Sequence, residues 1–404
     1  MLKTVIKKLK SPRLKEFIID IIDPFFKKQK NKIIFVVQDK TFFSGNIRIM
    51  CEYYLKYSKY DKIFIYKDGK CKSDIKNELE ELGIKVLDSF NLNSIYHIVT
   101  SGVVFLSHNP RNIHISRKFN SRLIINLWHG VAIKKIENSM QFIPPAKQKL
   151  LNNHAKLYDM IIASSDEDKK TNIHAFKVPE DIVKVTGLPR YEILKDSYPL
   201  GNTLSKEKNK IELIKKEKKI ILYAPTFRES NISAFEQILP AEWKILESFA
   251  KKNNFLIGLR PHPYDIKSLP EEIKNSSNFY LFDSKNFTEA NLLLKYVDLL
   301  IVDFTSIWVD YLLLNRPILG FAKDYEHYLK NERGFVYNFD EIFPDHFTSD
   351  INSLIENITL RMLNDGINTN YQATKDVLHK YDLNIYFPEL VYKEVESLRR
   401  KKFA

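Results

Sequence analysis

The 404-residue chain is poor in cysteine and glycine, with two cysteines and 11 glycines. Cys51 and Cys71 cannot build a disulfide framework, so a reducing compartment fits best. The scarcity of glycine means that glycine-rich phosphate loops cannot be the main ligand-binding device, and the P-loop pattern G-x-x-x-x-G-K-[S/T] does not occur. The sequence also lacks a nucleophile elbow G-x-S-x-G and any Cys/His spacing typical of a metal site. P-loop nucleotidases, hydrolases built on that elbow and zinc modules are therefore excluded.

Long hydrophobic runs are also absent. No stretch of about 18 uncharged apolar residues occurs, so no membrane-spanning helix is expected. Residues 1–32 contain neither the apolar core nor the cleavage site of a secretory signal. Hydrophobic residues nevertheless make up 44% of the chain, which excludes disorder, collagen and coiled coil as descriptions of the whole protein. The length predicts two domains.

The formal charge of +13 is unevenly distributed along the chain. Residues 1–32 carry 10 basic and 3 acidic side chains, residues 205–219 carry 7 and 3, and residues 393–404 carry 5 and 2. These segments account for the whole positive excess, so the rest of the chain is nearly neutral. This distribution argues against a nucleic-acid groove and favours a protein held at an anionic membrane surface by its basic ends.

The first 32 residues have an amphipathic pattern. Apolar residues recur at helical spacing on both sides of Pro12, and basic residues fill much of the other face. We predict that residues 1–32 form a basic amphipathic helical segment that lies on anionic lipid; the alternative is a helix packed on the first domain. Residues 393–404 form a basic tail, which is a second lipid contact or a frayed end. The apolar positions are Leu2, Val5, Ile6, Leu9, Leu14, Phe17, Ile18, Ile21, Ile22 and Phe25.

Short apolar runs rich in β-branched residues alternate with helical patterns through the middle of the chain. Such runs are typical of strands buried on both faces of a parallel sheet. We predict an α/β protein with a Rossmann-like domain at 33–196, a linker at 197–219 and a second Rossmann-like domain at 220–392. A cleft between two such domains is a natural ligand site. The predicted strands are Ile33–Val37, Lys62–Tyr66, Val103–Ser107, Leu123–Trp128, Met160–Ser165, Ile220–Ala224, Phe255–Leu259, Phe279–Phe282, Leu299–Asp303 and Ile318–Phe321.

The sequence Trp128-His129-Gly130 directly follows a predicted strand, with Lys134 shortly after it. A histidine at the carboxyl end of a parallel strand points into the ligand crevice and can accept a proton near neutral pH. Gly130 lets the backbone turn tightly or approach a ligand. His129 is therefore a candidate catalytic base, and the alternative is a histidine that only bonds a neighbouring loop.

Two further clusters follow strands in the second half. In Arg260-Pro261-His262-Pro263 the prolines hold the arginine and histidine, which suit phosphate oxygens, although a rigid structural turn is the alternative. In Asp303–Asp310 a helix is expected to begin at Thr305 or Ser306, and hydroxyls and free amides at such a junction can bind an anion without glycine. Plain N-capping, with Asp310 in solvent, is the alternative there.

Other polar residues lie at expected strand ends. Tyr223–Arg228 ends a strand with Thr226 and Arg228, and Arg333 precedes Gly334. Gly187–Arg190 is expected to form a hinge-like turn. Phe43–Asn46, with Ser44 and Asn46, follows the first strand and is expected to lie on the acceptor side.

Taken together and in this order, these clusters resemble the CDP-glycerol glycerophosphotransferase family, the teichoic-acid primases and polymerases. The matching motifs are W-H-G, Y-A-P-T-[WF]-R, R-x-H-P, D-[YF]-[ST]-S-x-x-x-D and R-G-[FY]. The resemblance covers roughly residues 33–390. It implies a GT-B-like pair of Rossmann-type domains and a monotopic protein on the cytoplasmic face of the bacterial plasma membrane. The motifs here are Trp128–Gly130, Tyr223–Arg228, Arg260–Pro263, Asp303–Asp310 and Arg333–Phe335.

The resemblance implies a reaction in which an acceptor hydroxyl attacks the β-phosphorus of a CDP-alditol, such as CDP-glycerol, and CMP leaves. His129 is then the base, and His262 assists the departing CMP. Ser44, Asn46, Gly130 and Lys134 are expected on the acceptor side. The residues expected to contact the donor phosphates are Thr226, Arg228, Arg260, Thr305, Ser306, Asp310 and Arg333.

No cofactor or metal is required by these residues, because arginine, histidine and a helix end can neutralise a diphosphate. The expected partners are the CDP-alditol, a lipid-linked glycan or polymer acceptor and the inner membrane surface, in synthesis of teichoic acid or a capsule-type polymer. Two other readings remain open. One is a GT-B glycosyltransferase that uses a nucleotide sugar for capsule or lipopolysaccharide; the other is a non-catalytic basic binding protein.

Overall fold

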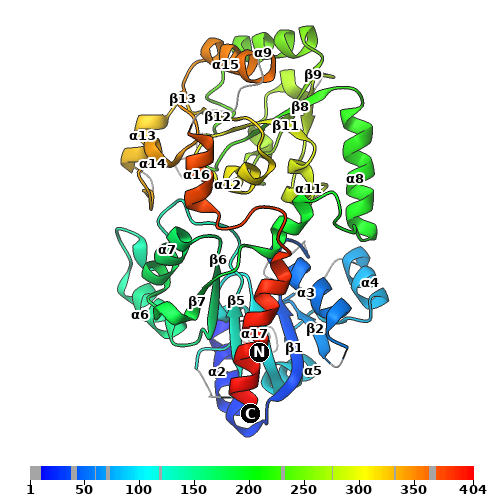
Figure 1. Ribbon diagram of the computed structural model, residues 1–404, viewed down its shortest axis with the longest axis vertical. Coiled ribbons are helices and arrows are strands. Elements are labelled where there is room, and N and C mark those ends of the chain that lie inside the picture. Colours follow the sequence, from blue (N-terminus) through cyan, green and yellow to red (C-terminus); the bar gives the residue numbers. More distant parts are fainter. Residues whose placement is uncertain are drawn as a thin grey trace, which may run out of the picture. The chain divides into compact units, whose positions relative to one another are not determined.

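The computed structural model describes residues 11–37, 43–59, 61–69, 73–117, 121–228, 233–274, 276–331, 334–363 and 370–404. The chain divides into two compact units, each built on one parallel sheet flanked by helices (Figure 1). The first unit comprises residues 1–130, 136–192 and 384–404, and the second comprises residues 131–135 and 193–383. The predicted α/β architecture with two parallel-sheet domains is therefore confirmed.

The sheet of the first unit has its strands in the order β3-β2-β1-β4-β5-β6-β7. The order reverses between β1 and β4, where Phe35 lies beside Phe105 and the two rings stack with centroids 4.6 Å apart. In doubly wound sheets ligands bind beyond the carboxyl ends of the strands at such a reversal. The strands are β1 (Gln29–Val36), β2 (Lys62–Tyr66), β3 (Lys85–Leu87), β4 (Ser101–Leu106), β5 (Leu123–Asn126), β6 (Met160–Ala163) and β7 (Val183–Val185).

The sheet of the second unit repeats this topology in the order β10-β9-β8-β11-β12-β13, with the reversal between β8 and β11. All of its strand pairs are parallel, and Leu222 of β8 lies beside Leu300 of β11. The strands are β8 (Lys219–Ala224), β9 (Phe255–Leu259), β10 (Phe279–Leu281), β11 (Val297–Val302), β12 (Ile318–Phe321) and β13 (Phe347–Thr348).

Helices connect the strands and cover both faces of each sheet. Strands such as β4 are therefore buried along their whole length. In the first unit they are α2 (Pro12–Ile22), α3 (Gly45–Tyr57), α4 (Ser73–Glu81), α5 (Leu92–Thr100), α6 (Pro145–Ala155), α7 (Asp166–Phe176) and α17 (Phe387–Phe403). In the second unit they are α8 (Asn202–Lys215), α9 (Pro240–Lys252), α10 (Glu271–Lys274), α11 (Ala290–Leu294), α12 (Ile307–Tyr311), α13 (Tyr325–Asn331), α14 (Phe339–Ile342), α15 (Ile351–Leu363) and α16 (Tyr371–Leu378).

The structure divides the chain differently from the predicted domain boundaries in two places. The segment expected as a linker contains α8, which belongs to the second unit because Leu204 and Ile211 are buried there. The expected basic tail is the end of α17, the red helix that lies beside α3 and β5 in the first unit (Figure 1). Arg399 in this helix pairs with Asp61, and Lys402 pairs with Asp159, so these two basic residues are part of the fold. A charge count cannot distinguish such paired residues from a free tail.

The amphipathic pattern of residues 12–25 forms α2 and a following 3₁₀ turn, and residues 1–10 lie outside the described part of the chain. Helix α2 buries Ile19 against the first unit, while Phe17 and Ile21 remain exposed. Asp23, directly after the helix, is buried between Lys28 and Arg122, at 3.1 and 2.7 Å. The helix is thus fixed on the domain and still presents an apolar face to solvent.

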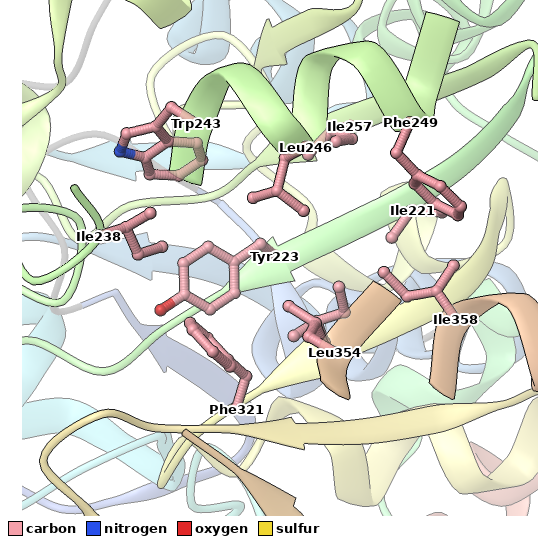
Figure 2. A pocket seen from close by; sticks show the side chains of 11 residues that line it. Ile221, Tyr223, Ile238, Trp243, Leu246, Phe249, Ile257, Phe321, Leu354 and Ile358 are labelled. Atoms are coloured by element: carbon pink, nitrogen blue, oxygen red, sulfur yellow. The ribbon is translucent and has the colours of Figure 1, made fainter. Parts of the chain in front are cut away.

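A small cavity of about 20 Å³ lies in the core of the second unit (Figure 2). Its wall is formed by apolar and aromatic side chains from β8, β9, β11, β12, α9 and α15, including Trp243 and Leu354. No charged side chain lines it. A dry apolar void of this kind is a packing feature of the core and not a site for a phosphorylated ligand.

Candidate functional site

The loop that carries His129 follows β5 and has an unusual backbone. Trp128 has φ 47° and Gly130 has φ 152°, so both residues have positive φ values that L side chains rarely adopt. The φ of Gly130 explains the glycine, because a side chain would be strained there even if the nearby end of Arg190 moved to make room for a Cβ. A bulky residue such as tryptophan keeps such a conformation only where its surroundings hold it.

Asn46 provides that support from the start of α3. Its amide nitrogen donates to the carbonyls of Leu127 at 2.8 Å and Trp128 at 3.1 Å. Its side-chain oxygen accepts from the backbone N–H of Arg190 at 3.0 Å. The side chain is 3% exposed. Asn46 was expected on the acceptor side, and the structure shows it as the residue that ties the loops after β1, β5 and β7 together.

We predict that Asn46→Ala lowers the turnover number about 10- to 100-fold, because loss of three hydrogen bonds lets the His129 loop shift by a fraction of an ångström or more. The measurement is turnover well below the melting temperature. Asn172→Ala is the matched control, since Asn172 is equally buried and bonds the carbonyl of Ile162 in the same unit. If the Asn46 and Asn172 variants lost the same stability and kept the same turnover number, Asn46 would have no positioning role.

The hydrogen bonds of His129 define which ring nitrogen is protonated. Its Nδ1 lies 3.2 Å from the backbone oxygen of Ser107, which can only accept, so Nδ1 carries the proton. Nε2 then has a free lone pair and no partner in the part of the chain that the structure describes. The surrounding protein desolvates the ring and Arg190 adds positive charge, which lowers the pKa of His129 to about 4 although part of the ring is open to solvent. At neutral pH this side chain is therefore an uncharged proton acceptor.

A second histidine, His108, lies against His129 and was missed in the sequence. The two rings stack with centroids 4.3 Å apart and an angle of 16°. Burial lowers the pKa of His108 to about 3, so both rings are neutral at pH 7. His108 follows β4 just as His129 follows β5. The rule that a histidine after a buried strand is a candidate site residue would therefore have selected His108 as well.

Arg190 also contacts this loop, although the sequence suggested only a hinge-like turn around it. Its guanidinium donates to the backbone carbonyl of His129. Ser44, expected on the acceptor side, precedes α3, and its half-buried hydroxyl bonds no other residue within the described segments. The first unit thus brings Ser44, Asn46, His108, His129 and Arg190 to the carboxyl ends of its strands.

Lys134 lies in the second unit, whereas the other residues that we predicted on the acceptor side lie in the first unit. The segment Val131–Lys135 is part of the second unit, where Lys135 N–H donates to Gly334 and Val336 N–H donates to Ile133. Lys134 Nζ lies 3.4 Å from Thr226 Oγ1. Arg333, expected among the phosphate contacts, lies outside the described residues.

In the second unit, Arg228 ties the ends of β8 and β11 together. Its guanidinium pairs with Asp303 at 2.6 Å and with Asp324 at 2.7 Å. Asp303 also accepts from the backbone N–H of Thr226 at 2.8 Å and is fully buried. The donors of Arg228 face two carboxylates and the carbonyl of Thr226, so the arginine organises this edge of the sheet.

Arg260 and His262 follow β9 and differ in their surroundings. Arg260 donates to the carbonyls of Phe282 at 3.1 Å and Phe287 at 3.3 Å, and its Nε–H has no partner among the described residues. His262 is exposed, and its Nδ1 accepts from the backbone N–H of Tyr264 at 3.4 Å. The proton of a neutral His262 is therefore on Nε2, which can donate. Although the residue is exposed, partial desolvation by the surrounding protein lowers the pKa of His262, against an opposing effect of Asp265.

The junction after β11 places two hydroxyls at the same carboxyl edge of this sheet. Thr305 and Ser306 are half-buried, and neither hydroxyl bonds another residue in the described part of the chain. Asp310 is 1% exposed inside α12, so it is part of the helix core and not a solvated end. The described residues include no group of three metal-ligating side chains arranged to hold an ion.

The two histidines have opposite hydrogen-bonding capacity. His129 presents a lone pair at Nε2, and His262 presents a proton at Nε2. The first unit therefore offers a proton acceptor at a strand end, and the second offers a donor, an arginine and two free hydroxyls at its own strand ends. A proton acceptor and phosphate-binding donors are the kinds of group that phosphoryl transfer to a hydroxyl uses.

Known proteins share both sequence and fold with this chain. The family model described as CDP-Glycerol:Poly(glycerophosphate) glycerophosphotransferase matches residues 19–383. A teichoic acid poly(ribitol-phosphate) polymerase of Bacillus spizizenii is 27% identical over 324 residues, which are 78% of this chain and 49% of the relative. A teichoic acid poly(glycerol phosphate) polymerase of the same species is 26% identical over 376 residues, 89% of each chain. A ribitol-phosphate polymerase of Staphylococcus aureus, TarL, is 25% identical over 336 residues, 82% of this chain and 57% of the relative.

Solved structures agree in fold. The wall teichoic acid polymerase TagF superposes with a TM-score of 0.80 at 19% identity, covering all of this chain and 97% of the other. A UDP-GlcNAc 2-epimerase of Neisseria meningitidis gives a TM-score of 0.54 at 14% identity, covering 91% and 100%. At these identities the likeness shows the fold alone. The chain spans about half the length of two of the curated relatives, at 49% and 57%.

Proposed function

Because the chain belongs to the CDP-glycerol:poly(glycerophosphate) glycerophosphotransferase family, we propose that it transfers an alditol phosphate from a CDP-alditol to an acceptor hydroxyl and releases CMP. The observation that carries this proposal is the pair of histidines with opposite Nε2 states at strand ends of two doubly wound sheets. The acceptor is a polyol phosphate or a membrane-linked glycan, as expected for teichoic-acid synthesis. The relatives include enzymes named for ribitol phosphate and for glycerol phosphate, so either alditol fits.

In the proposed reaction, His129 Nε2 removes the proton from the acceptor hydroxyl. The hydroxyl oxygen forms a new bond to the β-phosphorus as the bond between that phosphorus and the CMP oxygen breaks. Ser107 holds the protonated Nδ1, so the ring is fixed in the tautomer that the step needs. His108 stacks on the ring and keeps its plane in place.

On the donor side, the free hydroxyls of Thr305 and Ser306 donate to phosphate oxygens, and His262 Nε2–H donates to the departing CMP. Arg260 supplies positive charge beside them, with its Nε–H directed to the diphosphate. Arg228 and Thr226 act indirectly, because Arg228 is bonded to Asp303 and Asp324. Positioning and charge stabilisation account for most of the catalysis in such a transfer.

The proposal is tested by incubating the full chain with CDP-glycerol, CDP-ribitol and a panel of nucleotide sugars, together with a polyol-phosphate oligomer as acceptor. We expect release of CMP from at least one CDP-alditol and elongation of the oligomer by mass spectrometry. Release of UDP or GDP from a nucleotide sugar, with no CMP from either alditol donor, would contradict the proposal and favour a glycosyltransferase.

We also propose that the protein binds the anionic cytoplasmic face of the plasma membrane. No helix in the described part of the chain is long and apolar enough to cross a bilayer. Support for surface binding comes from α2 and the turn after it, which expose Phe17, Ile21 and Phe25 at 61%, 49% and 82%. Exposed apolar side chains beside basic residues are typical of helices that lie in the membrane interface. Sedimentation with vesicles that contain phosphatidylglycerol, and not with pure phosphatidylcholine, is the expected result.

A further inference from the structure

A buried lysine lies at the edge of the first sheet, near the amino ends of its strands. Lys32 of β1 is 3% exposed. Its ammonium donates to Thr100 Oγ1 at 2.6 Å and lies 4.7 Å from the centre of the Tyr96 ring. Within the described residues it has no carboxylate partner. A covered ammonium without an anion is costly to the fold, because a neutral hydroxyl and an aromatic face replace water only in part.

Two more lysines share this face of the sheet. Lys62 of β2 is the register partner of Lys32, and Lys85 of β3 pairs with Phe64, two residues further along β2. Side chains two residues apart on a strand lie on the same face, so Lys62 and Lys85 project beside Lys32. Both are exposed, and neither forms an ion pair inside the described ranges. We refer to Lys32, Lys62 and Lys85 as the lysine cluster.

The electrostatics of the lysine cluster are unbalanced. Burial lowers the pKa of Lys32, and the charges of Lys62 and Lys85 lower it further. His97 packs on Phe64 beside them, and burial together with Lys32 and Lys85 lowers its pKa to about 4. The Nδ1 atom of His97 is buried and lacks a hydrogen-bond partner. Folding thus gathers like charges at one place with no carboxylate among the described residues to balance them, and an external anion would relieve the repulsion.

Aromatic side chains border the lysine cluster. Tyr96 covers Lys32 and is itself 48% exposed. Phe26 packs edge-on against Tyr96 at 6.5 Å, and Phe25 beside it is 82% exposed. We call Phe25, Phe26 and Tyr96 the aromatic rim. The amphipathic Tyr96 beside lysines favours the level of lipid headgroups, and the exposed phenylalanines add apolar surface that can enter the membrane interface, whereas a soluble anion needs no such rim.

The rim is held rigidly on the domain. Glu16 of α2 pairs with Arg111 at 2.7 Å, and Asp23 pairs with the buried Arg122 at 2.7 Å. The exposed face of α2 and the turn after it therefore keeps its orientation beside the lysine cluster. The cluster lies toward the amino ends of the strands, whereas His129 follows the carboxyl end of β5. Occupation of the cluster would leave the loops at the carboxyl edge of the same sheet accessible.

We propose that the lysine cluster and the aromatic rim form a binding site for the phosphate headgroup of an anionic lipid, separate from the transfer site. The inference rests on the proposed membrane attachment and not on the proposed chemistry. Lys62 and Lys85 contact the phosphate oxygens, Lys32 adds its charge from below, and the aromatic rim enters the headgroup layer.

The test compares Lys62→Gln/Lys85→Gln with Lys251→Gln/Lys252→Gln in the full chain. Both double variants remove two exposed lysine charges, and Lys251 and Lys252 lie in the last turn of α9 in the second unit. Binding is measured by sedimentation with vesicles of phosphatidylcholine containing 30% phosphatidylglycerol, at fixed salt. At about one kilocalorie per lysine near an anionic surface, we expect the cluster variant to lose about 10- to 30-fold in partition coefficient and the control less than about threefold.

Two further measurements complete the test. Removing Lys62 and Lys85 relieves repulsion on Lys32, so we expect an equal or higher melting temperature, which shows that the variant is folded. CMP release with a soluble acceptor should stay within about twofold of the wild type. Equal loss of vesicle binding in both variants, or binding of inorganic phosphate at the cluster without a preference for phosphatidylglycerol vesicles, would overturn the lipid site. Failure of the wild type to bind these vesicles would overturn the membrane proposal as well, while normal CMP release would leave the transferase proposal intact.

Discussion

Replacement of His129 by alanine will lower the turnover number for CMP release by about 10²- to 10⁴-fold, the range typical for loss of a general base. Ser107 holds the ring through Nδ1, and Nε2 forms no hydrogen bond with the described residues. No neighbouring group therefore replaces its lone pair. His108 does not take over this role. Its Nδ1 lies 3.0 Å from Ser107 Oγ, and its ring stacks on that of His129, so it does not point a nitrogen into the position that His129 leaves. The measurement is steady-state CMP release with a soluble acceptor.

The matched control is His174→Ala. His174 is also an exposed histidine of the first unit, on α7, and we place it in no functional group. We expect its turnover to stay within about twofold of the wild type, and we expect both variants to keep the wild-type melting temperature because exposed side chains contribute little to stability. Near-normal turnover of the His129 variant would remove His129 from the mechanism.

The acidity of His129 gives a second, independent readout. Its pKa of about 4 lies below the ordinary value for histidine, so the ring stays unprotonated as the pH falls through 6.5. The acid limb of kcat/KM, which reports the free enzyme, should therefore lie near pH 4 to 5 and not near 6.5. An acid limb near 6.5 that disappears in a His129 variant would show that the base titrates as a solvated histidine.

The rule that polar residues directly after buried strands form a site depends only on local sequence, so the positions of the proposed site residues could be predicted. His129, His262, Thr305 and Ser306 each follow an apolar run, and the structure places each of them after a strand of a doubly wound sheet. The same logic gave the fold class, since buried parallel strands are continuous apolar runs. It missed three strands of only two or three residues, which are too short to form an apolar run: β3, β7 and β13.

Contacts between distant segments could not be predicted in this way. Arg190 lies 61 residues from His129, whose carbonyl it binds, and nothing in Gly187–Arg190 distinguishes a hinge from a support. Arg228 was expected to contact phosphate because a strand-end arginine often does. Its partners, Asp303 and Asp324, are 75 and 96 residues away, and only the tertiary fold shows that its donors face carboxylates.

Because of these ion pairs, we expect Arg228 to contribute more to the free energy of unfolding than any other proposed site residue. Arg228→Met will lower the free energy of unfolding by about 3–5 kcal/mol, because it leaves the fully buried carboxylate of Asp303 without a counter-charge. Lys170→Met is the control: the exposed Lys170–Glu167 pair, with side chains 72% and 40% exposed, should change stability by less than about 1 kcal/mol. Denaturant unfolding at pH 7 measures both, and a loss below about 1 kcal/mol in the Arg228 variant would show that the pair adds little.

The variant should lack part of the pH dependence that the wild type shows at low pH. Burial alone would raise the pKa of Asp324, but the Arg228 guanidinium holds it below its ordinary value. The pair therefore stabilises the wild type above the unfolded pKa, near 4, and this contribution is lost as the pH falls through the lower folded pKa. In Arg228→Met this contribution is absent. The stability difference between wild type and variant should consequently shrink as the pH falls below about 4, and Arg228→Met/Asp303→Asn should recover part of the loss at pH 7. Since Asp303 also holds the Thr226 N–H beside Thr305 and Ser306, a rise in KM for the donor in the double variant would link this ion pair to the shape of the phosphate site.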